Sequence, residues 1–325
     1  MSNLSTVSRS TKVFLFAVSL FIFIAGCNPA VYKKPAEDFH AATVCLKQTY
    51  FLEWELSNKA RIQRGDLEDQ IGIWTAPGSV DKSMIQRVAD RMKERQQEDI
   101  HKNLRPLREE AFAVIEGYAE IIVNLASDEP TEVIVSEING LTKDIDETLK
   151  AASKMKALVE YSDKITNFTG PLQQYANILT EIARLVSSAV RERAIVQTIG
   201  KSNDSIIELM SVLKEEAVAA HENAQSQIKG ARNELELFLG NPGLANTDNA
   251  IKAAVAKRIA DLDTLEKQIE DDEIDSVFDS AIKAQGALVK KALLRDAKDW
   301  AEQIRVFKNK VAAAEEAIEK VMSEM

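Results

Sequence analysis

The sequence is poor in residues that interrupt helices and in residues that bind metals. Among 325 residues there are 12 glycines, 7 prolines, 3 histidines and 2 cysteines, and aromatic residues make up 6%. Ala, Glu, Lys, Leu and Ile are plentiful instead. Such a composition is typical of long helices packed on one another. We therefore expect an all-α fold, an elongated bundle of about five long helices with coiled-coil-like antiparallel hairpins.

Patterns that would indicate catalysis or cofactor binding are also missing. A zinc site needs several converging ligands, but His40, His101 and His221 each lack a second histidine or cysteine within ligand spacing. Neither a glycine-rich phosphate loop nor a nucleophile elbow occurs. We predict no enzyme activity, no cofactor and no metal site, and we interpret the histidines as solvent-facing or packed side chains.

Charge in the sequence is predominantly acidic, with a formal net charge of −10. No basic face dominates, which argues against DNA or RNA as a partner. The densest acidic run is Glu270-Asp-Asp-Glu-Ile-Asp275, followed by Asp279. It lacks the central glycine and spaced terminal glutamate of an EF-hand loop. We interpret the run as a solvated bend within a helix, in preference to a weak cation site.

One long uncharged run lies near the start of the chain. A polar stretch with Arg9, Lys12 and no acid precedes it, the run itself covers Val13–Ile24, and small residues follow. A basic start, an apolar run and a small-residue exit predict a secretory signal over residues 1–26. The run is shorter than the roughly 20 residues that a membrane-spanning helix needs.

The end of this segment, Ile24-Ala25-Gly26-Cys27, resembles the lipobox of bacterial lipoproteins, with Ile in place of the commoner Leu. The resemblance implies cleavage between Gly26 and Cys27 and attachment of a lipid to Cys27. Two or more acyl chains make such anchoring stable. An ordinary signal with a chance cysteine is the alternative interpretation.

The lipoprotein resemblance also has consequences for the residues that follow. Asn28 follows the proposed lipidation site. Enteric-type lipoproteins that stay in the inner membrane carry Asp at this position. Asn28 therefore favours the outer membrane, facing the periplasm, if the host is Gram-negative. We expect a lipid-anchored tether over residues 27–35 and one helical bundle domain over 36–325. With Cys27 lipidated, Cys45 is unpaired; we interpret it as a small buried residue of the first helix, with an intermolecular disulfide as the alternative.

The few breakers divide the remaining chain into five predicted helices. Expected features within them are a break at Pro106, an interruption at Asn139-Gly140 and bends at Gly200 and Gly230. The predicted helices cover about 35–64, 81–127, 130–169, 171–239 and 247–325.

The last predicted helix has the most regular apolar pattern, with steps of three and four residues, which is coiled-coil spacing. Its members are Trp300, Ile304, Phe307, Val311, Ala314, Ile318 and Val321. We interpret this seam mainly as the core of an intramolecular hairpin. The alternative is an interaction seam offered to a second copy or to another helical protein.

These observations together favour a non-enzymatic envelope protein, a lipid-tethered helical scaffold that holds a protein partner or associates with itself. One alternative is a membrane-active helical protein like the elongated α-helical pore-forming toxins, although the best apolar run after residue 26, Ala119–Ala126, is short and contains Glu120 and Asn124. Another alternative is a small-ligand binder with its site among the helices.

The lipobox interpretation is tested by substituting each cysteine in turn. We expect Cys27→Ser to abolish incorporation of labelled palmitate and to move the chain out of the membrane fraction, because the thiol that accepts the lipid is gone. Cys45→Ser serves as the matched control and keeps both properties. Continued labelling of Cys27→Ser would contradict the prediction.

Overall fold

The computed structural model describes residues 29–75, 82–97, 104–127, 129–155, 162–241, 249–270, 274–294 and 300–325. Within these residues the chain is helical and contains no β-strand, which confirms the all-α prediction. A short 3-10 helix, η1, is followed by α-helices that are more numerous than the five predicted. The elements are η1 (Pro29–Tyr32), α2 (Lys33–Thr75), α3 (Lys82–Gln97), α4 (Arg105–Ala126), α5 (Thr131–Met155), α6 (Ser162–Ser188), α7 (Arg191–Gly240), α8 (Asn249–Glu270), α9 (Ile274–Leu294) and α10 (Trp300–Glu324).

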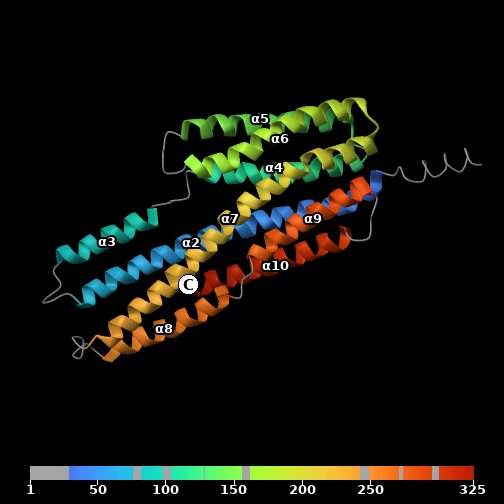
Figure 1. Ribbon diagram of the computed structural model, residues 1–325. Coiled ribbons are helices and arrows are strands. Elements are labelled where there is room, and N and C mark those ends of the chain that lie inside the picture. Colours follow the sequence, from blue (N-terminus) through green and yellow to red (C-terminus); the bar gives the residue numbers. More distant parts are fainter. Residues whose placement is uncertain are drawn as a thin grey trace, which may run out of the picture.

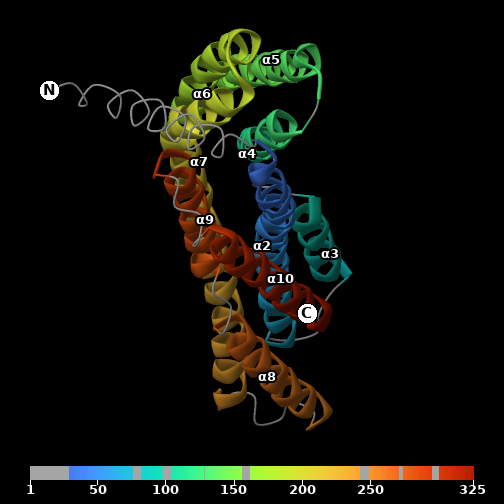
Figure 2. The same ribbon diagram turned by 90° about the vertical axis from the view of Figure 1, so that its right-hand side faces the viewer.

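Two long helices, α2 and α7, run along each other through an elongated body (Figure 1). They contain 43 and 50 residues, so they are roughly 65 and 75 Å long at 1.5 Å per residue. At one end α4, α5 and α6 form a layer against the first part of α7, while at the other end α8 pairs with the last part of α7 (Figures 1 and 2). We call the end where α2 begins the proximal end, and the end where α7 finishes the distal end.

The buried apolar side chains form two clusters. The larger one joins the first half of α2 to α4, α5, α6, α9 and parts of α7 and α10. The smaller one, which we call the distal core, lies among the second half of α2, the second half of α7, α8 and the end of α10. Its buried members are Leu56, Ala60, Ala224, Ile228, Ala231, Leu235, Phe238, Val255, Leu262, Leu265, Ile269, Ile318 and Val321.

The predicted end of the first helix at Gly65 is wrong, because α2 continues to Thr75. Gly65 is buried beneath α3, and a Cβ added there would lie 2.6 Å from the guanidinium of Arg95. The glycine therefore makes room for a side chain of the neighbouring helix instead of ending its own. The second predicted helix is divided into α3 and α4, and Pro106 lies in the first turn of α4, where its missing N–H removes no helical hydrogen bond.

The predicted boundary at Thr169-Gly170-Pro171 is also wrong, since Pro171 lies inside α6. An internal proline costs about 3 kcal/mol. Phe168, Leu172 and Tyr175 on this part of α6 are fully buried, and each contributes about 1.5–3 kcal/mol through removal from water. Burial thus outweighs the lost hydrogen bond. The true boundary, between α6 and α7, falls at Ala189-Val190, where there is neither glycine nor proline.

Asn139-Gly140 does not interrupt α5, and α7 continues without a break through Gly200 and Gly230. The fifth predicted helix is divided into α8, α9 and α10, with residues 271–273 and 295–299 outside the described part. α8 and α9 follow each other in one direction, and α10 returns antiparallel to α9 (Figure 1). The antiparallel packing that the sequence predicts is therefore present, but in shorter helices.

The continuity of α5 through Gly140 can be measured directly. Gly140 is exposed and no atom lies within 4 Å of a Cβ built on it. We expect Gly140→Ala to raise the free energy of unfolding by about 0.5–1 kcal/mol in chemical denaturation, because alanine loses less backbone entropy in a helix. Gly117→Ala should raise the free energy of unfolding by less, since its Cβ would lie 2.7 Å from Leu141. A loss of stability in Gly140→Ala would contradict an unbroken helix.

Candidate functional site

The lipidation and cleavage residues predicted from the sequence, Gly26 and Cys27, lie outside the described residues. The predicted seam of α10 is buried within the chain, because α10 packs on α2 and α9. The ring centroids of Trp300 and Tyr32 are 6.1 Å apart, as are those of Phe307 and Phe39. The seam residues Trp300, Ile304, Phe307, Val311, Ile318 and Val321 are each at most 2% exposed.

The other candidate residues do not converge on one site. His40 is half-buried, His221 is buried and His101 lies outside the described residues. Cys45 is a free, half-buried thiol that packs against the larger core. In the part of the chain that the structure describes, no group of three or more His, Cys, Asp or Glu side chains could hold a metal ion.

The acidic run spans the α8–α9 junction, of which residues 271–273 are not described. Asp275, the last residue of the run, and Asp279 both contact Lys214 on α7, at 2.8 and 2.5 Å from its Nζ. The two hydrogen bonds raise the pKa of Lys214. These acids thus join α9 to α7.

Charged side chains lie buried where α4 meets α2 and α7. Arg108 of α4 is 2% exposed, and its Nε donates to Oε2 of Glu216 on α7 at 2.6 Å. The hydroxyl of Tyr50 donates to the same oxygen at 3.1 Å, and burial raises the pKa of Tyr50, so the phenol stays a neutral donor. The Arg108 guanidinium also lies 4.0 Å from the ring centre of Trp54, a cation–π contact that offsets part of its desolvation.

One helical turn further along α2, Glu53 is fully buried and faces His221. Glu53 Oε1 lies 3.3 Å from Nδ1 of His221, whose Nε2 lies 3.1 Å from the amide nitrogen of Gln225. The second oxygen, Glu53 Oε2, has no hydrogen-bond partner among the described residues. Buried polar groups of this kind constrain how α2 and α7 align, because sliding either helix would leave them unpaired.

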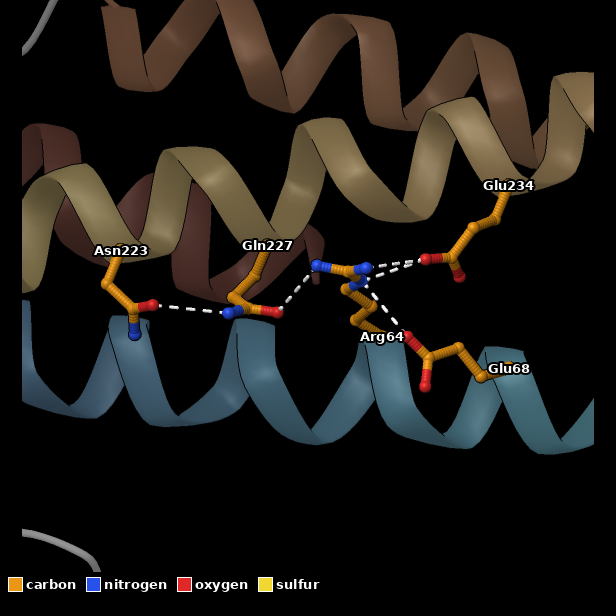
Figure 3. Close-up of polar contacts among 5 residues, drawn as sticks. All are labelled: Arg64, Glu68, Asn223, Gln227 and Glu234. Atoms are coloured by element: carbon orange, nitrogen blue, oxygen red, sulfur yellow. Dashed lines mark hydrogen bonds and ion pairs between the residues drawn. The ribbon is translucent and has the colours of Figure 1, made fainter.

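The polar contacts continue toward the distal end, where Arg64 reaches from α2 to α7 (Figure 3). Its guanidinium binds Glu234 at 2.7 Å, Glu68 at 3.2 Å and Oε1 of Gln227 at 3.4 Å. Burial raises the pKa of Glu234, although the ion pair with Arg64 opposes that shift. Gln227 in turn donates to Asn223. We call the contacts of Tyr50 to Glu68 on α2, and of Arg108 on α4, with Glu216 to Glu234 on α7 the polar ladder.

Gly230 has a specific role in the polar ladder. A Cβ added at Gly230 would lie 2.7 Å from Nη1 of Arg64. Glycine at this position therefore leaves room for the guanidinium beside α7, and a larger residue would require Arg64 to shift. The sequence suggests a bend at this position, whereas the structure shows a packing site.

Beside Arg64 the surface opens into a groove of about 460 Å³ between α2 and α8, with α7 as its floor. We call it the distal groove. α7 packs against both α2 and α8, but the backbones of α2 and α8 hardly approach each other. It is lined by Gln63, Asp66, Leu67, Gln70 and Trp74 of α2, Leu235 of α7, and Ala254, Val255 and Arg258 of α8.

The distal groove combines an apolar surface with a few polar groups. Trp74 is fixed by its ring contact with Phe238, at 5.3 Å between centroids. Arg258 donates to Oε1 of Gln63 at 3.1 Å across the groove. Burial raises the pKa of Asp66, which lies 3.5 Å from Arg95 of α3. A concave, mostly apolar surface with a few placed polar groups is the usual form of a binding site.

Sequence reasoning missed the distal groove because its residues come from α2 and, much later in the chain, from α7 and α8. The spacing of Gln63, Leu67, Gln70 and Trp74 places them on one face of a helix. That pattern could have been found only if the first helix had been extended beyond Gly65.

No protein-family model matches this chain, and neither a curated protein nor a solved structure shows significant similarity to it.

The buried Arg108–Glu216 pair gives a test of the polar ladder. We expect Arg108→Met to lower the free energy of unfolding by about 3–5 kcal/mol, because it leaves Glu216 charged and buried without its cation. Adding Glu216→Leu should restore part of that loss. Lys143→Met, which removes an exposed i,i+4 pair with Glu147, should change stability by less than about 0.5 kcal/mol. Equal losses of stability in Arg108→Met and Lys143→Met would contradict the role of the ladder.

Proposed function

We propose that the protein is a lipid-anchored envelope protein that acts as a non-enzymatic helical scaffold and binds a protein partner. The observation that carries this proposal is the distal groove, an open and mostly apolar surface at one end of an elongated body. A concave, mostly apolar surface with a few placed polar groups has the form that binding sites usually take. The lipobox-like segment supports the anchored location.

The position of the groove suits a tethered scaffold. Helical structure begins at Pro29, two residues after the proposed lipid attachment site at Cys27, and Tyr32 is already buried. Counting along α2 from Lys33, Gln63 lies about 45 Å and Trp74 about 60 Å away at 1.5 Å per residue. A body oriented along α2 would therefore present the groove well away from the lipid surface.

A second candidate function, the binding of a small apolar ligand, is favoured by the size of the groove. Its volume of about 460 Å³ falls within the roughly 300–1,000 Å³ of small-molecule sites. Gln63, Gln70 and Arg258 would then orient the polar end of the ligand. Screening lipids and apolar metabolites by thermal shift, with Leu67→Arg as the negative control, distinguishes this function from partner binding.

A membrane-active function, as in helical pore-forming toxins, remains a separate hypothesis. Within the described residues no helix combines the length and apolar character that crossing a membrane requires. Release of dye from liposomes by the purified protein would support this hypothesis over the scaffold.

The scaffold proposal is tested by lysine-reactive crosslinking in living cells that express either the native chain or Cys27→Ser. We expect a discrete protein to be captured by the lipidated form and lost with Cys27→Ser, because anchoring brings the two proteins to the same surface. Immunoblotting and mass spectrometry identify the product. Capture of nothing, or only of crosslinked copies of the chain itself, would contradict a scaffold.

A further inference from the structure

Several helix junctions meet at the proximal end of the molecule, which faces the viewer in Figure 2. The short helix η1 packs against α4 and α7 as well as α2. At the start of α7, Arg191 donates to the backbone carbonyls of Ser127 and Glu129, which follow α4. At the start of α10, the ring of Trp300 lies 6.1 Å from that of Tyr32 in η1. We call this end the proximal face; its described residues are 29–34, 127, 129–133, 188–193, 290–293 and 300–302.

Exposed apolar side chains gather on the proximal face. Seven large apolar side chains are exposed in the part of the chain that the structure describes, and four of them belong to this face. Val190, between α6 and α7, is 77% exposed. Leu293, near the end of α9, lies beside Gly200 of α7 and is 54% exposed. Single exposed apolar residues are normal, so the feature that needs an explanation is their position at one end. The four residues are Val31, Val133, Val190 and Leu293.

The proximal face also has more basic than acidic side chains, although the chain as a whole has a net charge of −10. Exposed apolar side chains beside lysine and arginine suit the headgroup layer of a bilayer. The apolar groups enter the acyl boundary, while the cations approach anionic lipid phosphates. The described basic residues of the face are Lys33, Lys34, Arg191, Arg193, Lys290 and Lys291, and the acidic ones are Glu129, Glu132, Glu192 and Glu302.

The proposed lipid site places a bilayer next to this face. Cys27 precedes Pro29 by two residues, which span at most about 7 Å of extended chain. The polar headgroup layer is itself roughly 5–7 Å thick on each side of the hydrocarbon. A lipid on Cys27 would therefore bring η1 to the headgroups, together with the junctions that pack on η1. So short a link leaves no room for a protein partner between the face and the lipid.

We propose that the proximal face is a membrane-contact surface, which rests on the headgroup layer with Val190 and Leu293 reaching the acyl boundary. The inference rests on the proposed lipid-anchored location and adds the orientation of the body, which an anchor alone leaves open. With this face on the membrane, α2 and α7 extend away from the bilayer. The distal groove is then held about 45–60 Å from the lipid surface at 1.5 Å per residue of α2.

Fluorescent probes on the mature lipidated protein measure this orientation in liposomes of phosphatidylethanolamine and phosphatidylglycerol. In a Cys45→Ser background, Val190→Cys or Leu293→Cys is labelled with the fluorophore NBD. Leu237→Cys, near the distal end of α7 and 75% exposed, is the matched control. We expect blue-shifted emission and quenching by headgroup-level spin-labelled lipid from both proximal probes, because they lie in the headgroup layer. The Leu237→Cys probe should show neither effect.

Charged substitutions show whether the apolar side chains make the contact. Val190→Glu combined with Leu293→Glu should remove most of the quenching of a probe on Val133→Cys, because carboxylates are repelled by the anionic lipid and disfavoured at the acyl boundary. Leu237→Glu is the matched control and should leave that quenching unchanged. The substituted side chains are exposed, and circular dichroism checks that the variants are folded. If the double variant fails to fold, each single substitution replaces it.

Three outcomes would overturn the inference. They are no quenching of either proximal probe, equal quenching of the Leu237→Cys probe, which would mean that the body lies flat, and unchanged quenching at Val133→Cys after the glutamate substitutions. If Cys27 still incorporates palmitate in these cases, the anchored location stands without the proposed orientation. If Cys27 incorporates no palmitate and the chain does not bind the liposomes, the anchored location and the membrane-contact surface are both wrong.

Discussion

The contact between α2 and α7 is the interaction on which the rest of the molecule depends. Every other described α-helix packs against one or both of these helices or against a helix that does. The polar ladder fixes their relative position, because Tyr50, Glu53 and Arg64 of α2 each have a partner on α7 or face one. A purely apolar interface of this length could slide by one turn at little cost, whereas buried charges are strongly destabilised when their partners move away.

The structure has two parts with different properties. Around the larger core, α4, α5, α6 and α9 enclose α2 and α7 on most sides. Along their second halves, α2 and α7 are accompanied by α8, the end of α10 and α3, which packs on α2. The distal groove follows from the packing of the fold, since α2 and α8 both pack on α7 while their own backbones hardly approach each other.

The fold class could be predicted from the sequence because three features all indicate helices. They are the abundance of helix-forming residues, the scarcity of Gly and Pro, and apolar residues spaced by three and four positions. The α10 seam is an example: Phe307 and Val311 are fully buried. Helix ends were harder to predict, because Gly65 and Gly230 accommodate arginines of neighbouring helices, and Pro171 is tolerated by burial. Ala189-Val190 carries no local signal for its break. The groove joins residues nearly 200 positions apart, and periodicity within single helices carries no information on such pairings.

The pairing of α2 with α10 has a consequence for the order of folding. Lys59 and Met322 are 263 positions apart in the chain, yet they lie in direct contact. The part of α2 that contacts α10 therefore cannot be buried until the last helix has been made, and loop closure over such a separation slows folding. Until then this part of α2 stays exposed to solvent and open to binding by a chaperone.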